Sequence, residues 1–161
     1  MSERVAETLV ELLKAQGLTC ATAESCTGGG VGSAITAVPG SSAVFAGGVI
    51  SYSNDVKHEV LGVDSETLAA FGAVSPETAA QMAVGVRNLL KTDLAVSLTG
   101  IAGPDGGSEA KPVGLVWFGL ATKQGVRTEK AIFRGDRQGI RQNAVVHALG
   151  MLTVAASGAA S

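Results

Sequence analysis

The residues with the most obvious reactivity lie in one short stretch, residues 23–30, which reads Ala-Glu-Ser-Cys-Thr-Gly-Gly-Gly. Ser25 and Cys26 are both potential nucleophiles. A β-like run at 18–22 precedes the stretch and an apolar helical pattern follows it, so we predict a strand-to-helix turn. Such a turn can expose a nucleophile and direct backbone N–H groups toward an anion. The alternative is an ordinary helix start with Thr27 or Ser25 as N-cap.

A second candidate is Lys57, which follows Tyr52 in the sequence Tyr-Ser-Asn-Asp-Val-Lys. If Tyr52 ends a strand and Ser53 caps a short helix, Lys57 lies in the first turn, where the positive helix end disfavours its charged form. Burial would lower the pKa of Lys57 further and make it a base near neutral pH. The alternative is a solvated lysine on a surface helix, which is the usual environment of lysine.

A long glycine-rich loop at 99–112 and two arginines beyond it are candidates for substrate binding. Loops of more than about 12 residues without secondary structure are usually functional. Gly100 and Gly103 would let the backbone approach a ligand closely. Arg137 and Arg141 are four residues apart, share a helix face and could clamp a phosphate. Equally, they could form a surface pair balanced by a neighbouring aspartate.

Common nucleotide and metal motifs are missing from the sequence. There is no GxxxxGK[ST] loop, and residues 28–33 depart from GxGxxG at the last position, so we expect no Rossmann cofactor. Thr27, Gly28 and Gly29 could still hold one phosphate at a helix N-terminus. The two histidines are far apart and no Cys/His cluster is present, so we expect neither a metal site nor a cofactor.

The elements that must position these residues alternate between helices and buried strands. We predict helices between Ser2 as N-cap and Gly17, at 28–38, 54–61, 65–71, from Ser75-Pro76 to 90 and from about 136, with strands at 18–23, 45–52, 94–98, 113–122 and 126–133. This order predicts an α/β fold, a three-layer α/β/α sandwich with a mixed, mostly parallel sheet of about five strands. Ligands bind beyond the carboxyl ends of strands in such sheets, so loops 24–30, 51–57 and 99–112 should meet.

Length and composition favour one domain over residues 1–161, with 155–161 as a tail that could fray. The net charge of −2 argues against broad nucleic-acid binding. No apolar run reaches the roughly 18 residues that span a membrane, and no signal peptide opens the chain. Cys20 and Cys26 form no disulfide framework, so we expect a reducing, cytoplasmic compartment. The sequence leaves a homo-oligomer open.

Six motifs together resemble one family. They are Ala-Glu-Ser-Cys-Thr-Gly-Gly at 23–29, Tyr-Ser-Asn-Asp-Val-Lys at 52–57, Gly-Ala-Val-Ser at 72–75, Thr-Gly-Ile-Ala-Gly-Pro-Asp-Gly-Gly at 99–107, Lys-Pro-Val-Gly at 111–114 and Gly-Asp-Arg at 135–137. They resemble the C-terminal domain of competence/damage-inducible protein A (CinA), the nicotinamide-nucleotide amidase family. The resemblance spans nearly the whole chain. The N-terminal domain that many CinA proteins carry is missing, so we expect the stand-alone amidase form.

The resemblance implies hydrolysis of nicotinamide mononucleotide to nicotinic acid mononucleotide and ammonia, in pyridine-nucleotide salvage and without a cofactor. It also implies a site of Ser25, Tyr52 and Lys57. Ser25 would attack the carboxamide, and Lys57, directly or through Tyr52, would move the proton. Backbone N–H groups around 26–28 would stabilise the oxyanion. For the substrate we expect contacts from Thr27, Gly28, Gly29, Thr99, Gly100, Gly103, Arg137 and Arg141.

Two alternatives stay open at this point. One is a Cys26-dependent amidohydrolase, for which His58 is the only candidate base near a predicted site loop. The other is a non-catalytic nucleotide-binding module, linked to competence or DNA damage, that would bind nicotinamide mononucleotide without releasing ammonia. The slightly acidic composition disfavours direct contact with DNA.

Overall fold

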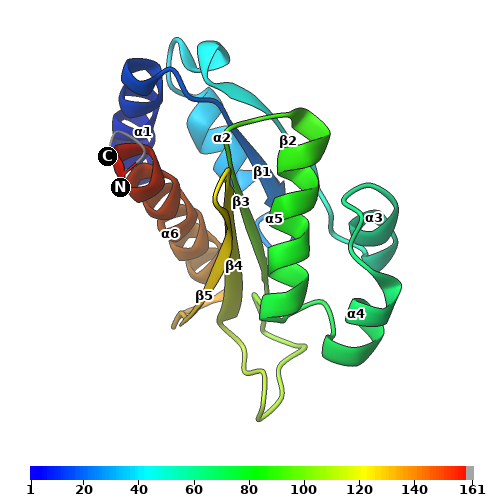
Figure 1. Cartoon of the computed structure of the whole chain (residues 1–161). Coiled ribbons are helices and arrows are strands. Elements are labelled where there is room, and N and C mark those ends of the chain that lie inside the picture. Colours follow the sequence, from blue (N-terminus) through cyan, green and yellow to red (C-terminus); the bar gives the residue numbers. More distant parts are fainter. Residues whose placement is uncertain (159–161) are drawn as a thin grey trace.

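A five-stranded sheet forms the middle layer of the structure, a computed structural model that describes residues 1–158 (Figure 1). The strand order is β2-β1-β3-β4-β5, with bounds Cys20–Glu24 for β1, Phe45–Ile50 for β2, Leu94–Gly100 for β3, Leu115–Thr122 for β4 and Gly125–Ile132 for β5. β1 pairs in parallel with β2 and β3, whereas β4 runs antiparallel to both β3 and β5. The predicted mixed sheet, with one strand reversed, is confirmed.

Helices cover both faces of the sheet, which confirms the predicted three layers (Figure 1). They are α1 (Ser2–Gln16), α2 (Gly30–Thr36), α3 (Asn54–Glu59), α4 (Ser65–Phe71), α5 (Pro76–Leu90) and α6 (Arg137–Gly158), with a short 3-10 turn at Ser41–Ala43. α1, α2 and α6 pack together on one face, where Phe118 and Leu149 belong to the larger buried apolar cluster. α5 covers the other face, where Met82 and Ala95 belong to a second cluster.

Most helix boundaries follow the signals in the sequence. The Ser53 hydroxyl accepts from the Val56 N–H at the start of α3, and the Ser75 hydroxyl does the same for Thr78 at the start of α5. Ser2, predicted as an N-cap, is instead the first residue of α1. Residues 155–158, which we expected to fray, continue α6 because its apolar stripe still packs on the core. Residues 159–161 of that predicted tail lie outside the described residues.

The parallel register brings the predicted site loops to one edge. Glu24, the last residue of β1, pairs with Ile50 of β2 on one side and with Leu98 of β3 on the other. The chain therefore leaves all three strands at about the same height of the sheet. The loops after β1, β2 and β3 meet beyond this edge, as the sequence predicted.

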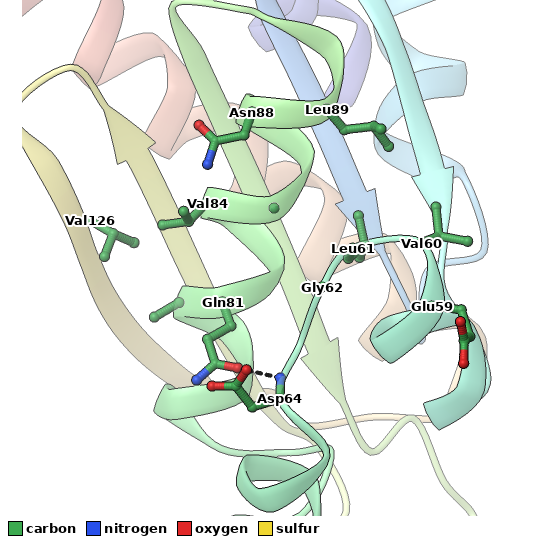
Figure 2. A pocket seen from close by; sticks show the side chains of 12 residues that line it. Glu59, Val60, Leu61, Gly62, Asp64, Gln81, Val84, Asn88, Leu89 and Val126 are labelled. Carbon is green, nitrogen blue, oxygen red and sulfur yellow. Dashed lines mark hydrogen bonds between the residues drawn. The ribbon is translucent and has the colours of Figure 1, made fainter.

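A close crossing holds the segment between α3 and α4 against α5. A Cβ atom at Gly85 would overlap the carbonyl oxygen of Leu61. Figure 2 shows the segment with Leu61 and Gly62 passing beside α5. Glycine at position 85 therefore lets the backbone of the α3–α4 segment touch the helix.

We expect Gly85→Ala to destabilise the fold by about 1–3 kcal/mol, because overpacking against backbone atoms has little room to relax. Gly150→Ala in α6 is a matched control, since apart from its chain neighbours and the backbone of its own helix no heavy atom lies within 4 Å of the position that its Cβ would take. There the helix propensity of alanine should stabilise by about 1 kcal/mol. Urea unfolding midpoints measure both effects. If the midpoints of both variants shift in the same direction, the contact between Gly85 and the Leu61 backbone is less close than described.

Candidate active site

Ser25 is the first residue after β1, and the turn that follows it leads into α2. Its N–H donates to the Leu98 carbonyl of β3 at 3.0 Å, which fixes the backbone at the edge of the sheet. Its hydroxyl oxygen lies 3.0 Å from the Lys57 Nζ atom. The predicted strand-to-helix turn is thus confirmed, and it presents the serine to a lysine from a distant helix.

Lys57 projects from α3 into the protein and is only 1% exposed. Its Nζ atom contacts the Ser25 hydroxyl, the Ser51 carbonyl at 2.7 Å and the Tyr52 carbonyl at 3.2 Å. Burial lowers the pKa of Lys57, because the ammonium form loses its hydration. The surface-lysine alternative is therefore wrong.

The partners of Lys57 also orient its lone pair. A neutral amine has two hydrogens and one lone pair. If the carbonyls of Ser51 and Tyr52 accept both hydrogens, the lone pair is left facing the Ser25 hydroxyl. Ser51 is itself held by the Glu24 carbonyl, to which its N–H and its hydroxyl both donate. The arrangement can remove a proton from the serine hydroxyl.

A cavity of about 190 Å³ opens over this pair. It is lined by Ser25, Cys26, Tyr52, Lys57, Ala73, Val74, Thr99, Gly100, Ala102 and Arg137. The three predicted loops all contribute, together with the segment just before α5. The Thr99 hydroxyl donates to the Ala73 carbonyl at 2.8 Å and ties that segment to the end of β3. Ala73 and Val74 carry no reactive group and were not predicted at the site, although the motif at 72–75 could have indicated them.

A more open hollow of about 670 Å³ lies over the outer face of α5 (Figure 2). Its ionisable lining residues are Glu59 and Asp64, which are both exposed, and it has no nucleophile. The smaller cavity is therefore the better candidate for chemistry, because it combines a hydroxyl with a buried amine.

Tyr52 lies at the mouth of the cavity, with its side chain 65% exposed. Its phenol oxygen accepts from Nη2 of Arg137 at 3.4 Å, a long contact, and its carbonyl rather than its phenol meets Lys57. A proton path from Ser25 through the phenol to Lys57 is therefore not formed in this structure. The direct contact between Ser25 and Lys57 makes that relay unnecessary.

Arg137 and Arg141, which we predicted as a phosphate clamp, have different partners in the structure. Arg137 lines the cavity, and its Nη1 donates to the Gly103 carbonyl at 2.7 Å. Arg141 instead donates to the backbone, from Nε to the Cys26 carbonyl at 3.0 Å and from Nη2 to the Thr27 carbonyl at 3.2 Å. Only Arg137 is therefore placed to meet a ligand that enters this cavity.

The expected phosphate site at the start of α2 is already filled by a carboxylate of the protein. Glu24 is 1% exposed, and its oxygens accept from the Thr27 hydroxyl at 2.6 Å, from the Val31 N–H at 2.9 Å and from the Gly32 N–H at 3.0 Å. The hydroxyl of Thr27, which we predicted to bind phosphate together with Gly28 and Gly29, therefore has a partner within the protein. Neither Ser25 nor Thr27 is the N-cap of α2.

Backbone conformation and packing within the protein explain why glycine stands at Gly29 and Gly100. Gly29, the N-cap of α2, has a φ of 102°, which favours glycine. A Cβ at Gly100 would come within 2.6 Å of the Val116 side chain and 2.7 Å of the Leu115 carbonyl. Gly100 lines the cavity, but strand packing rather than close approach of a ligand requires glycine there.

The alternative cysteine mechanism needs a thiolate and a neighbouring base, and the structure provides neither at Cys26. Cys26 lines the cavity, but burial raises the pKa of its thiol to about 11, so the thiolate is scarce near neutral pH. The predicted base, His58, has its Nδ1 atom 2.7 Å from the Val63 carbonyl and does not line the cavity. The two side chains therefore form no catalytic pair.

We also looked among the described residues for groups that could bind a metal and for helices that could span a membrane. Within residues 1–158, no group of three or more His, Cys, Asp or Glu side chains is placed to hold a metal ion. Over the same residues, we find no helix with the length and apolar character needed to cross a bilayer.

Comparisons with known proteins agree on one family. The sequence pattern described as the CinA C-terminal domain matches residues 2–155. The chain is 50% identical over 147 residues to the nicotinamide-nucleotide amidohydrolase PncC of Escherichia coli K12, with 91% of this chain and 89% of that protein covered. It is also similar to the crystal structure of the competence/damage inducible protein CihA from Agrobacterium tumefaciens. There the TM-score is 0.93 at 44% identity, with 97% and 95% of the two chains covered.

Some relatives are much longer than this chain. A Caldanaerobacter subterraneus protein, named as competence-damage inducible, is 53% identical over 150 residues. The match covers 93% of this chain and only 36% of that protein, so the chain spans about a third of its length.

Proposed function

The chain belongs to the family of the CinA C-terminal domain, and from that premise we propose that it hydrolyses the carboxamide of nicotinamide mononucleotide to nicotinic acid mononucleotide and ammonia. The observation that carries the proposal is the 3.0 Å contact between the Ser25 hydroxyl and the buried Lys57 amine. The name of the 50% identical PncC protein supplies the substrate class. The reaction would serve pyridine-nucleotide salvage.

In the first half of the reaction, the Ser25 oxygen attacks the carboxamide carbon while neutral Lys57 takes the hydroxyl proton. The tetrahedral intermediate carries an oxyanion, which N–H groups of the turn after Ser25 stabilise. Its C–N bond then breaks as Lys57 delivers the proton to the leaving nitrogen. Ammonia departs, and the nicotinoyl group remains on Ser25 as an ester.

In the second half, water attacks the ester carbon and Lys57 takes a proton from that water. The carbon–oxygen bond to Ser25 breaks, Lys57 returns the proton to the serine oxygen, and the free acid leaves. At the end of the cycle Ser25 and Lys57 have returned to the protonation states in which they began. No metal or organic cofactor enters these steps.

The cavity suits only part of the substrate. Its volume of about 190 Å³ is below the roughly 300–1,000 Å³ of sites that bury a whole drug-sized ligand. We place the aromatic carboxamide inside, against Val74, Ala102 and Thr99, and the ribose phosphate at the mouth. Tyr52 and Arg137 lie there, far apart in the sequence but in contact with each other.

The test is ammonia release from nicotinamide mononucleotide, nicotinamide riboside and nicotinamide, each with and without a chelator. The proposal expects the nucleotide to be the best substrate and the chelator to have no effect. Tight binding of the nucleotide without ammonia release would favour the non-catalytic binding module instead. The partner that we propose is a small molecule, the nucleotide substrate. We also propose a cytoplasmic site of action, because both cysteines are free and buried.

Arg137→Ala should raise the KM for nicotinamide mononucleotide by roughly 10- to 150-fold, the range for a lost charge-assisted hydrogen bond. The guanidinium at the mouth is the cation best placed for the phosphate. Nicotinamide riboside lacks the phosphate and provides the internal control, for which KM should change little. Equal losses for both substrates would mean that Arg137 supports the loop through Gly103 and does not recognise the phosphate.

A further inference from the structure

Arg141 reaches from α6 to the turn that carries Ser25. Its guanidinium donates to two successive backbone carbonyls, those of Cys26 and Thr27, which lie 115 and 114 residues earlier in the chain. Arg141 is absent from the residues that line the cavity. The side chain therefore contacts the backbone of the turn outside the cavity that we propose for the carboxamide.

Holding these carbonyls also fixes the N–H groups on the other side of each peptide. A peptide is planar and trans, so its carbonyl and the following N–H point in opposite directions. With the Thr27 carbonyl on Arg141, the Gly28 N–H is directed back to the Ser25 carbonyl, to which it donates at 3.1 Å. With the Cys26 carbonyl on Arg141, the Thr27 N–H faces away from α6, and within the described chain it has no hydrogen-bond acceptor.

A second charged side chain holds the same turn from the opposite end. The Glu24 carboxylate accepts from the Thr27 hydroxyl and from N–H groups of Val31 and Gly32. Glu24 thus binds donors of the turn and the start of α2, whereas Arg141 binds acceptors of the turn. The four residues after Ser25 contain two glycines with positive φ, which are flexible, and the two charged side chains add to the backbone hydrogen bonds from Gly28 N–H to Ser25 and from Gly30 N–H to Thr27.

We propose that Arg141 is a positioning residue for the reaction, which fixes the Ser25 turn so that the serine oxygen faces the reacting carbonyl. The inference rests on the proposed amidase function. It assigns to Arg141 a role in kcat, through the backbone, in place of phosphate recognition. Glu24 serves the same turn, but its burial makes its variants prone to unfold, so Arg141 is the better residue to test.

The test compares Arg141→Ala and Arg141→Lys with the wild type in ammonia release from nicotinamide mononucleotide. We expect kcat to fall about 100-fold in the alanine variant, the scale for a misplaced reacting group or a lost oxyanion donor, with KM changed less than about 3-fold. Lysine keeps the charge but not the planar pair of donors, so it should not restore kcat. Added guanidinium ion at non-denaturing concentration should restore part of the activity of the alanine variant.

Arg134→Ala is the matched control, because Arg134 is exposed and its side chain makes no hydrogen bond or ion pair within the described chain. It should match the wild type in kcat and KM. A rise in KM for the nucleotide but not for the riboside in Arg141→Ala would overturn the proposal and make Arg141 a phosphate ligand. An unchanged kcat in either Arg141 variant would overturn it as well.

A second readout separates this proposal from the proposed function. Reaction of Ser25 with phenylmethylsulfonyl fluoride, followed by mass spectrometry, needs an oriented serine but no nucleotide. We expect labelling to slow at least about 10-fold in Arg141→Ala and to stay unchanged in Arg134→Ala. If the wild type is labelled at Ser25 but releases no ammonia, the substrate is wrong and the positioning role still stands. Equal labelling of Arg141→Ala and wild type would refute that role.

Discussion

Ser25→Ala is expected to lower ammonia release from nicotinamide mononucleotide by about 10⁴-fold or more, to the level of the background, while the fold stays intact. Removal of a serine nucleophile has effects of this size, because no other group can form the acyl intermediate. The side chain is small, and its hydroxyl contacts Lys57. Lys57 keeps the Ser51 and Tyr52 carbonyls as acceptors in the variant, so the site should not collapse.

Ser33→Ala is the control for this substitution, since Ser33 lies exposed on α2 and away from the cavity. Its rate should equal that of the wild type. Thermal unfolding of both variants checks that the fold is kept. If Ser25→Ala stays within a few-fold of wild type, Ser25 is not the nucleophile. Cys26→Ala then becomes the decisive variant, because on the serine mechanism it keeps its activity.

The fold follows from local signals that the sequence displays openly. The alternation of helical and strand periodicities predicted the layers, and Ser53 and Ser75 marked two helix starts through short-range capping. The rule that ligands bind beyond the carboxyl ends of parallel strands predicted that the loops of Ser25 and Lys57 meet, and the two side chains are in contact. These inferences succeed because each depends on residues within a few positions of one another, or on strand order.

The contacts that the sequence did not predict are those that depend on how distant elements pack against one another. Glu24 precedes the first residue of α2 by six positions and still caps that helix, a separation that lies outside the usual capping patterns. Arg141 donates its hydrogen bonds to two backbone carbonyls in the turn between β1 and α2. Both contacts depend on how α2 and α6 pack, and packing cannot be deduced from the spacing of charges. The spacing of charges therefore did not show that the Thr27 hydroxyl and the Arg141 guanidinium have partners within the protein.

Lys57→Met should reduce kcat by at least about 100-fold, the low end for a positioned acid–base group. Methionine keeps an unbranched stem in the buried position but cannot accept the serine proton. Lys57→Arg should fail as well, because a guanidinium stays protonated at any pH at which the protein is folded. Unfolding midpoints of both variants, measured beside kcat, separate loss of the base from loss of the fold. An active arginine variant would mean that position 57 supplies charge and not proton transfer.

The pH dependence of the wild type tests the same role without a substitution. Lys57 acts as a base only when neutral, so kcat should rise as the pH increases through its pKa in the substrate complex. Because burial lowers this pKa, the rise should fall clearly below the range in which an exposed lysine titrates. Lys57→Met, assayed at its residual rate, should lose this rise. A rise in the wild type near the ordinary lysine value, or one kept by the methionine variant, would show that another group removes the serine proton.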